Sequence, residues 1–168
     1  LALSADTKGA SNVAIGRSAL TTQNFTTGTD SFNVAVGDRA GTAVTTGGNN
    51  TLVGGLAGDA LTDADFNVAL GYNALSSDTL GSKSTAIGTF ALETQNFTTA
   101  TDTHNTAVGY FAGVSVTDGL KNTFIGSLAG DATNTGDFNT FIGYDTGGSN
   151  TGGSNNTIVG SGSQTATV

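Results

Sequence analysis

The chain has 168 residues, of which 26 are glycine and none is proline, cysteine or methionine. Its formal net charge of −8, without any basic cluster, argues against nucleic-acid or anionic-membrane binding. The lack of cysteine excludes disulfides and thiolate metal sites. No apolar run approaches the roughly 18 residues that a membrane-spanning helix needs. We expect one repeat domain over residues 1–168, forming a fragment of a longer chain.

A five-residue phrase ending in glycine recurs nine times along the chain. The phrases occupy residues 12–16, 33–37, 50–54, 67–71, 84–88, 105–109, 122–126, 139–143 and 156–160. Eight of them begin with asparagine, at Asn12, Asn33, Asn50, Asn67, Asn105, Asn122, Asn139 and Asn156. The closing glycines are Gly16, Gly37, Gly54, Gly71, Gly88, Gly109, Gly126, Gly143 and Gly160. A period of 17 to 21 residues predicts an all-β solenoid of about nine stacked coils.

Each phrase is apolar on both faces of the strand it predicts. The second and fourth positions carry β-branched or aliphatic residues, such as Val13 and Ile15, and the third is most often alanine, such as Ala14. A strand that is apolar on both sides is buried on both sides. One face should line the coil and the other should meet a partner chain, which predicts a homo-oligomer. We assign the second-position threonines to the interior because they share a face with isoleucine and valine.

The remaining positions predict how the coils turn and stack. The phrase glycines are expected at corners that need a positive φ or a close backbone approach. The asparagines are expected to form a ladder in which side-chain amides bond to the next coil. Nine coils at about 4.8 Å each give a rod on the order of 40 Å long.

Residues 11–72 and 83–144 align without gaps and match at roughly half of their positions, which indicates that a block of four coils was duplicated. Two of the steps between phrases are 21 residues instead of 17, because residues 21–30 and 93–102 carry the related insertions TTQNFTTGTD and ETQNFTTATD. The surrounding segments 21–32 and 93–104 are therefore the candidate recognition loops. Their phenylalanines, Phe25 and Phe97, either plug the coil or contact a ligand, and we favour the plug.

Few residues suggest site chemistry. His104 is the only histidine, and its counterpart one block earlier is Phe32, so no histidine-based catalytic set or zinc site can be assembled. The acidic pairs Asp59 with Asp65 and Asp131 with Asp137 are weak calcium candidates, with turn capping as the alternative. The tyrosines that follow phrase glycines (Tyr72, Tyr110 and Tyr144) are expected to pack structurally. We expect no enzyme activity, no cofactor and no resident metal.

The phrase N-x-A-[IV]-G, in variants such as NTAVGYFAG and NTFIGSLAG, resembles repeats of bacteriophage tail and head fibres and of trimeric autotransporter adhesin heads. The resemblance covers residues 11–163. It implies a left-handed parallel β-roll that associates as a homotrimer. The coils here are longer than those of the adhesin heads. Residues 1–168 contain no stalk, anchor or chaperone sequence, so we do not extend the resemblance to cell attachment or self-cleavage.

Three functions remain open at this stage. The first is a trimeric shaft or head of a phage fibre in the virion, with a host-surface glycan or protein as receptor. The second is a bacterial cell-surface adhesin or extracellular fibril subunit. The third is an ice-binding solenoid, which needs a regular array of exposed threonines, and the inward assignment of the threonines counts against it.

Overall fold

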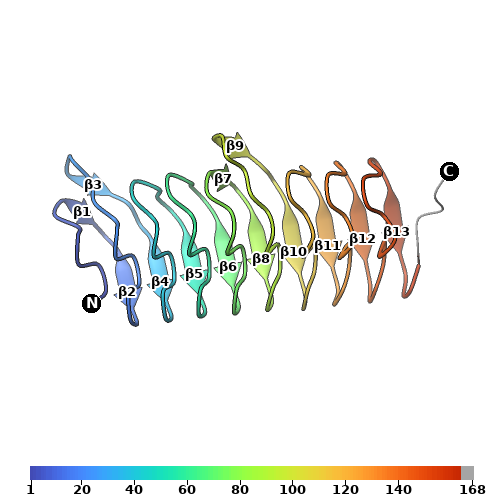
Figure 1. Ribbon diagram of the computed structural model, residues 1–168, viewed down its shortest axis with the longest axis horizontal. Coiled ribbons are helices and arrows are strands. Elements are labelled where there is room, and N and C mark those ends of the chain that lie inside the picture. The colour runs from blue at the N-terminus through green and yellow to red at the C-terminus, as the bar shows by residue number, and fades with distance from the viewer. Residues whose placement is uncertain (164–168) are drawn as a thin grey trace.

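A computed structural model describes residues 1–163 and confirms the β-solenoid. No helix occurs in that range, and nine parallel strands form one continuous sheet along the rod (Figure 1). The strands of this sheet are β2 (Val13–Ile15), β4 (Val34–Val36), β5 (Thr51–Val53), β6 (Val68–Leu70), β8 (Thr85–Ile87), β10 (Thr106–Val108), β11 (Thr123–Ile125), β12 (Thr140–Ile142) and β13 (Thr157–Val159). Each strand is the second to fourth residue of one phrase, so the sequence period and the structural period coincide.

The coils stack in exact phrase register through a buried asparagine ladder. Thr106 pairs with Thr123, and the remaining strand residues pair in step. Ahead of the strands, the side-chain oxygen of Asn105 accepts a 2.8 Å hydrogen bond from the backbone N–H of Asn122. The side-chain amide of Asn122 donates to the Gly136 carbonyl at 2.8 Å, which ties its own coil together. Six ladder asparagines therefore each join neighbouring coils and also close one: Asn33, Asn50, Asn67, Asn105, Asn122 and Asn139. The two end asparagines, Asn12 and Asn156, only join coils.

The phrase glycines stand where the backbone leaves the strand and neighbouring coils approach closely. Gly109 has φ +142°, and a Cβ added there would lie 2.4 Å from the carbonyl oxygen of Gly126. Such a distance is a severe clash with backbone, and the dihedral is one that side chains disfavour. Both sequence-based reasons for glycine, positive φ and close approach, apply at this position.

The coil interior is filled from two sides by residues whose sizes compensate. The third phrase position points inward, as at Ala86 and Phe124, and the opposite wall contributes the fourth residue after each glycine. Where the strand supplies Ala86, the wall of the same coil supplies Leu92; where it supplies Phe124, the wall supplies Gly130. A Cβ on Gly130 would lie 2.5 Å from the Phe124 ring. In two coils both sides are small, Ala35 with Gly41 and Ala107 with Gly113, and large side chains of the neighbouring levels reach the glycine there. The interior is thus packed with little free space.

The inward assignment of the second and fourth phrase positions is wrong. Ile15 and Val159 are 59% and 69% exposed, whereas the third-position Ala35 and Ala107 are fully buried. The interior of a 17-residue coil is too narrow for two larger side chains beside the opposite wall, so the alanine face turns inward. We call the second and fourth phrase positions of the nine strands the outer face.

The two insertions form short parallel ladders beside the main sheet. β1 (Gly9–Ala10) pairs with β3 (Thr29–Asp30), and β7 (Gly81–Ser82) pairs with β9 (Thr101–Asp102). In Figure 1, β3 and β9 stand out along the upper edge of the rod, four coils apart. Each insertion is therefore an ordered segment that pairs with the preceding coil.

Candidate functional site

The phenylalanines of both insertions are buried. Phe25 is 7% exposed and Phe97 is 8% exposed, so neither ring is available to a ligand. The threonines at the tips, including Thr26 and Thr98, are exposed instead. In this conformation the part of each insertion that faces solvent is polar.

The second insertion is held by a buried carboxylate that sequence reasoning missed. Asp78 accepts hydrogen bonds from the backbone N–H groups of Gly81 and Phe97, at 3.1 and 2.9 Å. Its other oxygen accepts from the Gln95 side chain, whose own oxygen accepts from Asn105 at 2.8 Å. The chain of contacts links the insertion to the asparagine ladder. Both carboxylate oxygens act as hydrogen-bond acceptors in this network.

The first insertion repeats this arrangement at the start of the rod. Asp6 accepts from the Gly9 N–H at 2.7 Å and from the Gln23 side chain at 2.6 Å. Gln23 accepts from the side chain of Asn33 at 2.8 Å. In both blocks an aspartate precedes a glutamine by 17 residues, and an asparagine follows ten later. That spacing was the available sequence signal for this anchor.

The two anchor carboxylates differ in pKa because they differ in burial. Burial raises the pKa of Asp78 above its ordinary value, outweighing the hydrogen bonds from Gln95, Phe97, Gly81 and Thr79 that oppose it. Burial also acts upward on Asp6, but the hydrogen bonds from Gln23, Gly9 and Lys8, with a further one from Phe25, hold the pKa of Asp6 below its ordinary value. Asp6 is only partly buried, whereas Asp78 is fully enclosed.

We expect the two anchors to respond oppositely to acid. The stabilisation from Asp6 is present at neutral pH and is lost as the pH falls through its lowered folded pKa. Folding favours the protonated form of Asp78, so its contribution to stability grows as the pH falls through its raised folded pKa. Carbon-13 NMR titration of the carboxyl groups, assigned with Asp6→Asn and Asp78→Asn, measures this. Equal titration midpoints for the two groups would contradict the expectation.

The four calcium candidates do not gather into a metal site. Asp65 accepts the Gly48 N–H and Asp137 accepts the Leu120 N–H, each at 2.7 Å and each from the preceding coil. Asp59 and Asp131 lie elsewhere on their coils, and burial raises the pKa of both. Within residues 1–163, no group of three or more acidic or histidine side chains could hold a metal ion. Capping between coils is the role that the contacts of Asp65 and Asp137 show.

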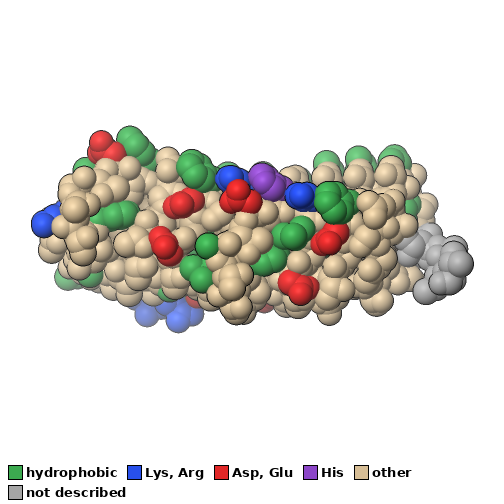
Figure 2. All heavy atoms as spheres, turned by 90° about the horizontal axis from the view of Figure 1, so that it is seen from above, with side chains coloured by type: hydrophobic (Ala, Val, Ile, Leu, Met, Phe, Trp, Pro, Cys, Tyr) green, Lys and Arg blue, Asp and Glu red, His purple; other side chains and the backbone are tan. Residues whose placement is uncertain are grey.

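His104 belongs to a column of exposed residues that we call the corner ridge. The ridge consists of the residue before each phrase: Ser11, Phe32, Asn49, Phe66, Lys83, His104, Lys121, Phe138 and Asn155. All nine are exposed, and all have a positive φ between 51° and 64°. Figure 2 shows the histidine in a row with basic side chains on either side. Sequence reasoning treated His104 as isolated because it did not follow this column.

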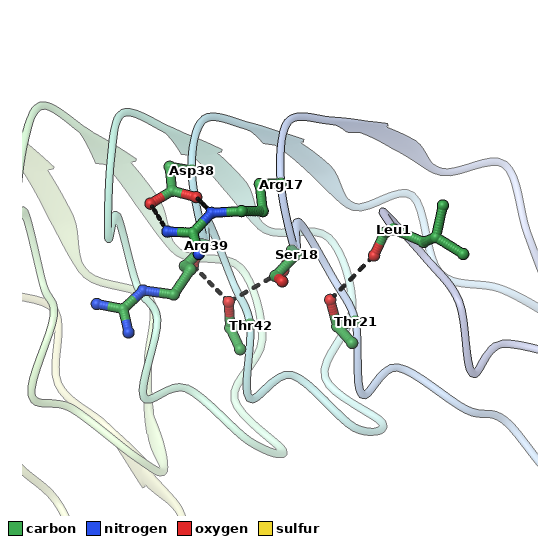
Figure 3. Close-up of polar contacts among 7 residues, drawn as sticks. All are labelled: Leu1, Arg17, Ser18, Thr21, Asp38, Arg39 and Thr42. Atoms are coloured by element: carbon green, nitrogen blue, oxygen red, sulfur yellow. Dashed lines mark hydrogen bonds and ion pairs between the residues drawn. The ribbon is translucent and has the colours of Figure 1, made fainter.

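The corner after each phrase glycine differs between the two blocks. In the first block, Arg17 donates two hydrogen bonds to Asp38, at 2.7 and 2.8 Å, across neighbouring coils (Figure 3). Where the two blocks meet, aromatic rings occupy this corner: the centroids of Phe90 and Phe111 are 4.8 Å apart, and Tyr72 packs edge-on against Phe90. Tyr72 and Tyr110 thus pack against neighbouring rings, and all three tyrosines, Tyr144 included, remain about half exposed.

Comparison with known proteins adds no assignment. No family model, curated protein or solved structure matches this chain. None of the described residues belongs to a helix long and apolar enough to cross a membrane.

Proposed function

We propose that this chain is a structural module of a fibre in which three copies associate through their outer faces. A bacteriophage fibre that attaches the virion to its host is the setting we favour, because the phrase resembles phage-fibre repeats. The observation that carries the proposal is the outer face itself. Its eighteen positions on nine strands are all valine, isoleucine, leucine or threonine, without one charged residue.

The exposed large apolar side chains of the rod lie almost entirely on the outer face and at the two corners that precede and follow each phrase. Leu1 is the single exception among the large exposed hydrophobic residues of the described chain. The others are Val13, Ile15, Leu70, Ile125 and Val159 on the outer face, Phe32, Phe66 and Phe138 in the corner ridge, and Tyr72, Tyr110 and Tyr144 just after phrase glycines. An apolar strand face of this kind marks an interaction site in soluble proteins. Covering the outer face, with the corner ridge left open, contributes roughly 25 cal/mol per Å² of apolar area.

We expect the assembly to dissociate when charge is placed on the outer face. Leu70→Asp combined with Ile125→Asp introduces two carboxylates at exposed positions of β6 and β11, where the isolated coil tolerates them but a packed interface does not. Sedimentation equilibrium and native mass spectrometry should give three chains for the parent protein and one for the variant, with an unchanged β-sheet circular dichroism spectrum.

The matched control is Thr98→Asp with Thr99→Asp, which adds the same charge at the exposed tip of the second insertion. This control should remain trimeric. A monomeric parent protein would overturn the proposal, and so would a trimer that survives both outer-face carboxylates. A stable pair of chains would keep the interface but contradict the number three, which rests on the fibre resemblance.

A cell-surface adhesin or extracellular fibril subunit would use the same interface, with a host glycan or protein as its partner. The ice-binding alternative also gains from the structure, because its threonines lie on the outer face. Thr85, Thr106, Thr123, Thr140 and Thr157 follow one another in five consecutive coils. Thermal hysteresis measured on the monomeric Leu70→Asp, Ile125→Asp variant and on the parent protein separates the two uses, because a closed trimer covers this array.

A further inference from the structure

The corner ridge changes character along the rod. Its middle three residues, Lys83, His104 and Lys121, are basic and lie on three consecutive coils, and exposed phenylalanines stand at both ends, Phe66 and Phe138. These three make up half of the six lysine, arginine and histidine side chains in the whole chain. One block earlier, the counterparts of the basic residues are Ser11, Phe32 and Asn49, so the duplication left the first block without this cluster.

The backbone holds the ridge rigidly. The N–H groups of Lys83, Lys121 and Phe138 donate to carbonyls of the preceding coil, at 3.0, 2.8 and 2.9 Å. A positive φ is uncommon for residues other than glycine, and here it occurs at lysine, histidine and phenylalanine in turn. The constant spacing of the stacked coils places Lys83 and Lys121 two coils apart, or about 9.6 Å along the rod. A ligand therefore meets charges and rings in a fixed order. Binding costs little backbone conformational entropy, because the backbone of the ridge is already ordered.

Both lysines of the ridge have a partner within the free protein. Lys83 forms a salt bridge with Asp102 of the second insertion, and its hydrogen bond holds the pKa of Asp102 below the ordinary value. The ammonium of Lys121 lies 4.9 Å from the centre of the Phe138 ring. Asp102 is exposed and can be displaced, because solvent screens surface pairs of this kind and they contribute little to stability.

We propose that residues Phe66, Lys83, His104, Lys121 and Phe138 form a binding site for an acidic oligosaccharide that lies along the rod axis. Its carboxylates meet Lys83 and Lys121, its polar groups reach His104, and the flat apolar faces of its sugars stack on Phe66 and Phe138. The site deepens the proposed function, since it names the class of receptor and its place on the fibre.

The charge of the chain selects among anionic ligands. A net charge of −8 repels polymers of high charge density such as nucleic acids. At physiological salt, charges farther apart than about 8 Å are largely screened, so the ridge governs only what touches it. A linear ligand with an anion on every second unit matches the two lysines on either side of His104, and its apolar faces beyond these anions match Phe66 and Phe138 at the ends of the site. The ridge is a single exposed column, which suits a flexible chain laid on a surface.

The test uses fluorescently labelled hyaluronate hexasaccharide, which carries a carboxylate on alternate sugars, with neutral chitohexaose of the same length for comparison. Fluorescence polarisation should show binding of hyaluronate that weakens with added salt, and much weaker binding of chitohexaose. Lys83→Gln with Lys121→Gln should reduce the affinity at least about tenfold, because charge-assisted contacts are lost. Asp102→Asn should increase the affinity, because Lys83 then lacks its competing partner.

Phe32→Ser is the matched control for Phe66→Ser with Phe138→Ser, since all three rings lie in the same column with similar exposure. Only the pair beside the basic residues should weaken hyaluronate binding. The site is overturned if the parent protein does not bind hyaluronate, binds chitohexaose equally, or keeps its affinity after both lysines are replaced. Sedimentation of the same samples separates the two proposals. A trimer that does not bind hyaluronate would contradict the binding site alone, and a monomer that binds hyaluronate would contradict the fibre assembly alone.

Discussion

Replacing Asn122 by leucine is expected to lower the free energy of unfolding by about 3 to 5 kcal/mol, because the change leaves buried polar groups without partners. The Asn122 side chain is fully buried and holds two backbone groups at once. Its amide donates to the Gly136 carbonyl at 2.8 Å, and its oxygen accepts the Asn139 N–H at 2.9 Å. A leucine side chain makes neither hydrogen bond, and water cannot enter the packed coil to replace them. The loss should therefore exceed that of an ordinary surface substitution several-fold.

Asn49→Leu is the control for this ladder substitution. Asn49 precedes the ladder residue Asn50 but lies exposed in the corner ridge with φ +58°. Its replacement should cost about 1 kcal/mol or less, mainly from the left-handed backbone. Urea denaturation followed by circular dichroism measures both variants on the same assembled protein. Similar losses for Asn49→Leu and Asn122→Leu would show that the ladder amides contribute no more than exposed ones.

The repeat itself was the most predictable part of this fold. The phrase positions gave all nine strands of the main sheet, because a strand apolar on both faces and closed by glycine recurs at near-constant spacing. The choice of inner face was not predictable from alternation, since both faces are apolar. The decisive cue was volume: Ala86 pairs with Leu92, whereas Phe124 pairs with Gly130. This compensation in side-chain size can be recognised only when the residues of the opposite wall of the coil are known.

The polar contacts of the insertions and the surface columns were harder to foresee. Asp78 and Gln95 are separated by one full coil, so their contact depends on stacking register, which a linear motif search does not see. His104 and Lys121 are 17 residues apart and become neighbours for the same reason. In a solenoid, the coil period replaces sequence proximity as the measure of nearness. Reading every column, including those outside the phrase, would have shown the corner ridge.

Exchanging Phe124 for alanine and Gly130 for leucine is expected to be far less damaging in combination than separately. Phe124→Ala alone removes a fully buried ring and should cost about 3 to 5 kcal/mol. Gly130→Leu alone forces a side chain against that ring, because a Cβ at this position would lie 2.5 Å from it. Overpacking of this kind costs about 1 to 3 kcal/mol or more. Together they recreate the arrangement of Ala86 with Leu92, which the coil already accommodates two levels away.

A double-mutant cycle by urea denaturation should show a favourable coupling of about 2 kcal/mol or more between the two substitutions. The backbone conformation at this position is compatible with leucine, since Leu92 at the equivalent position of another coil has φ +49° and is fully buried. Any failure must therefore come from packing. The Phe124 ring also lies against Gly113, where an added Cβ would be 2.7 Å from it, so part of the vacated space stays unfilled and recovery should be incomplete. Strictly additive losses would mean that the two walls do not share one volume, and the size compensation along the rod would then be coincidental.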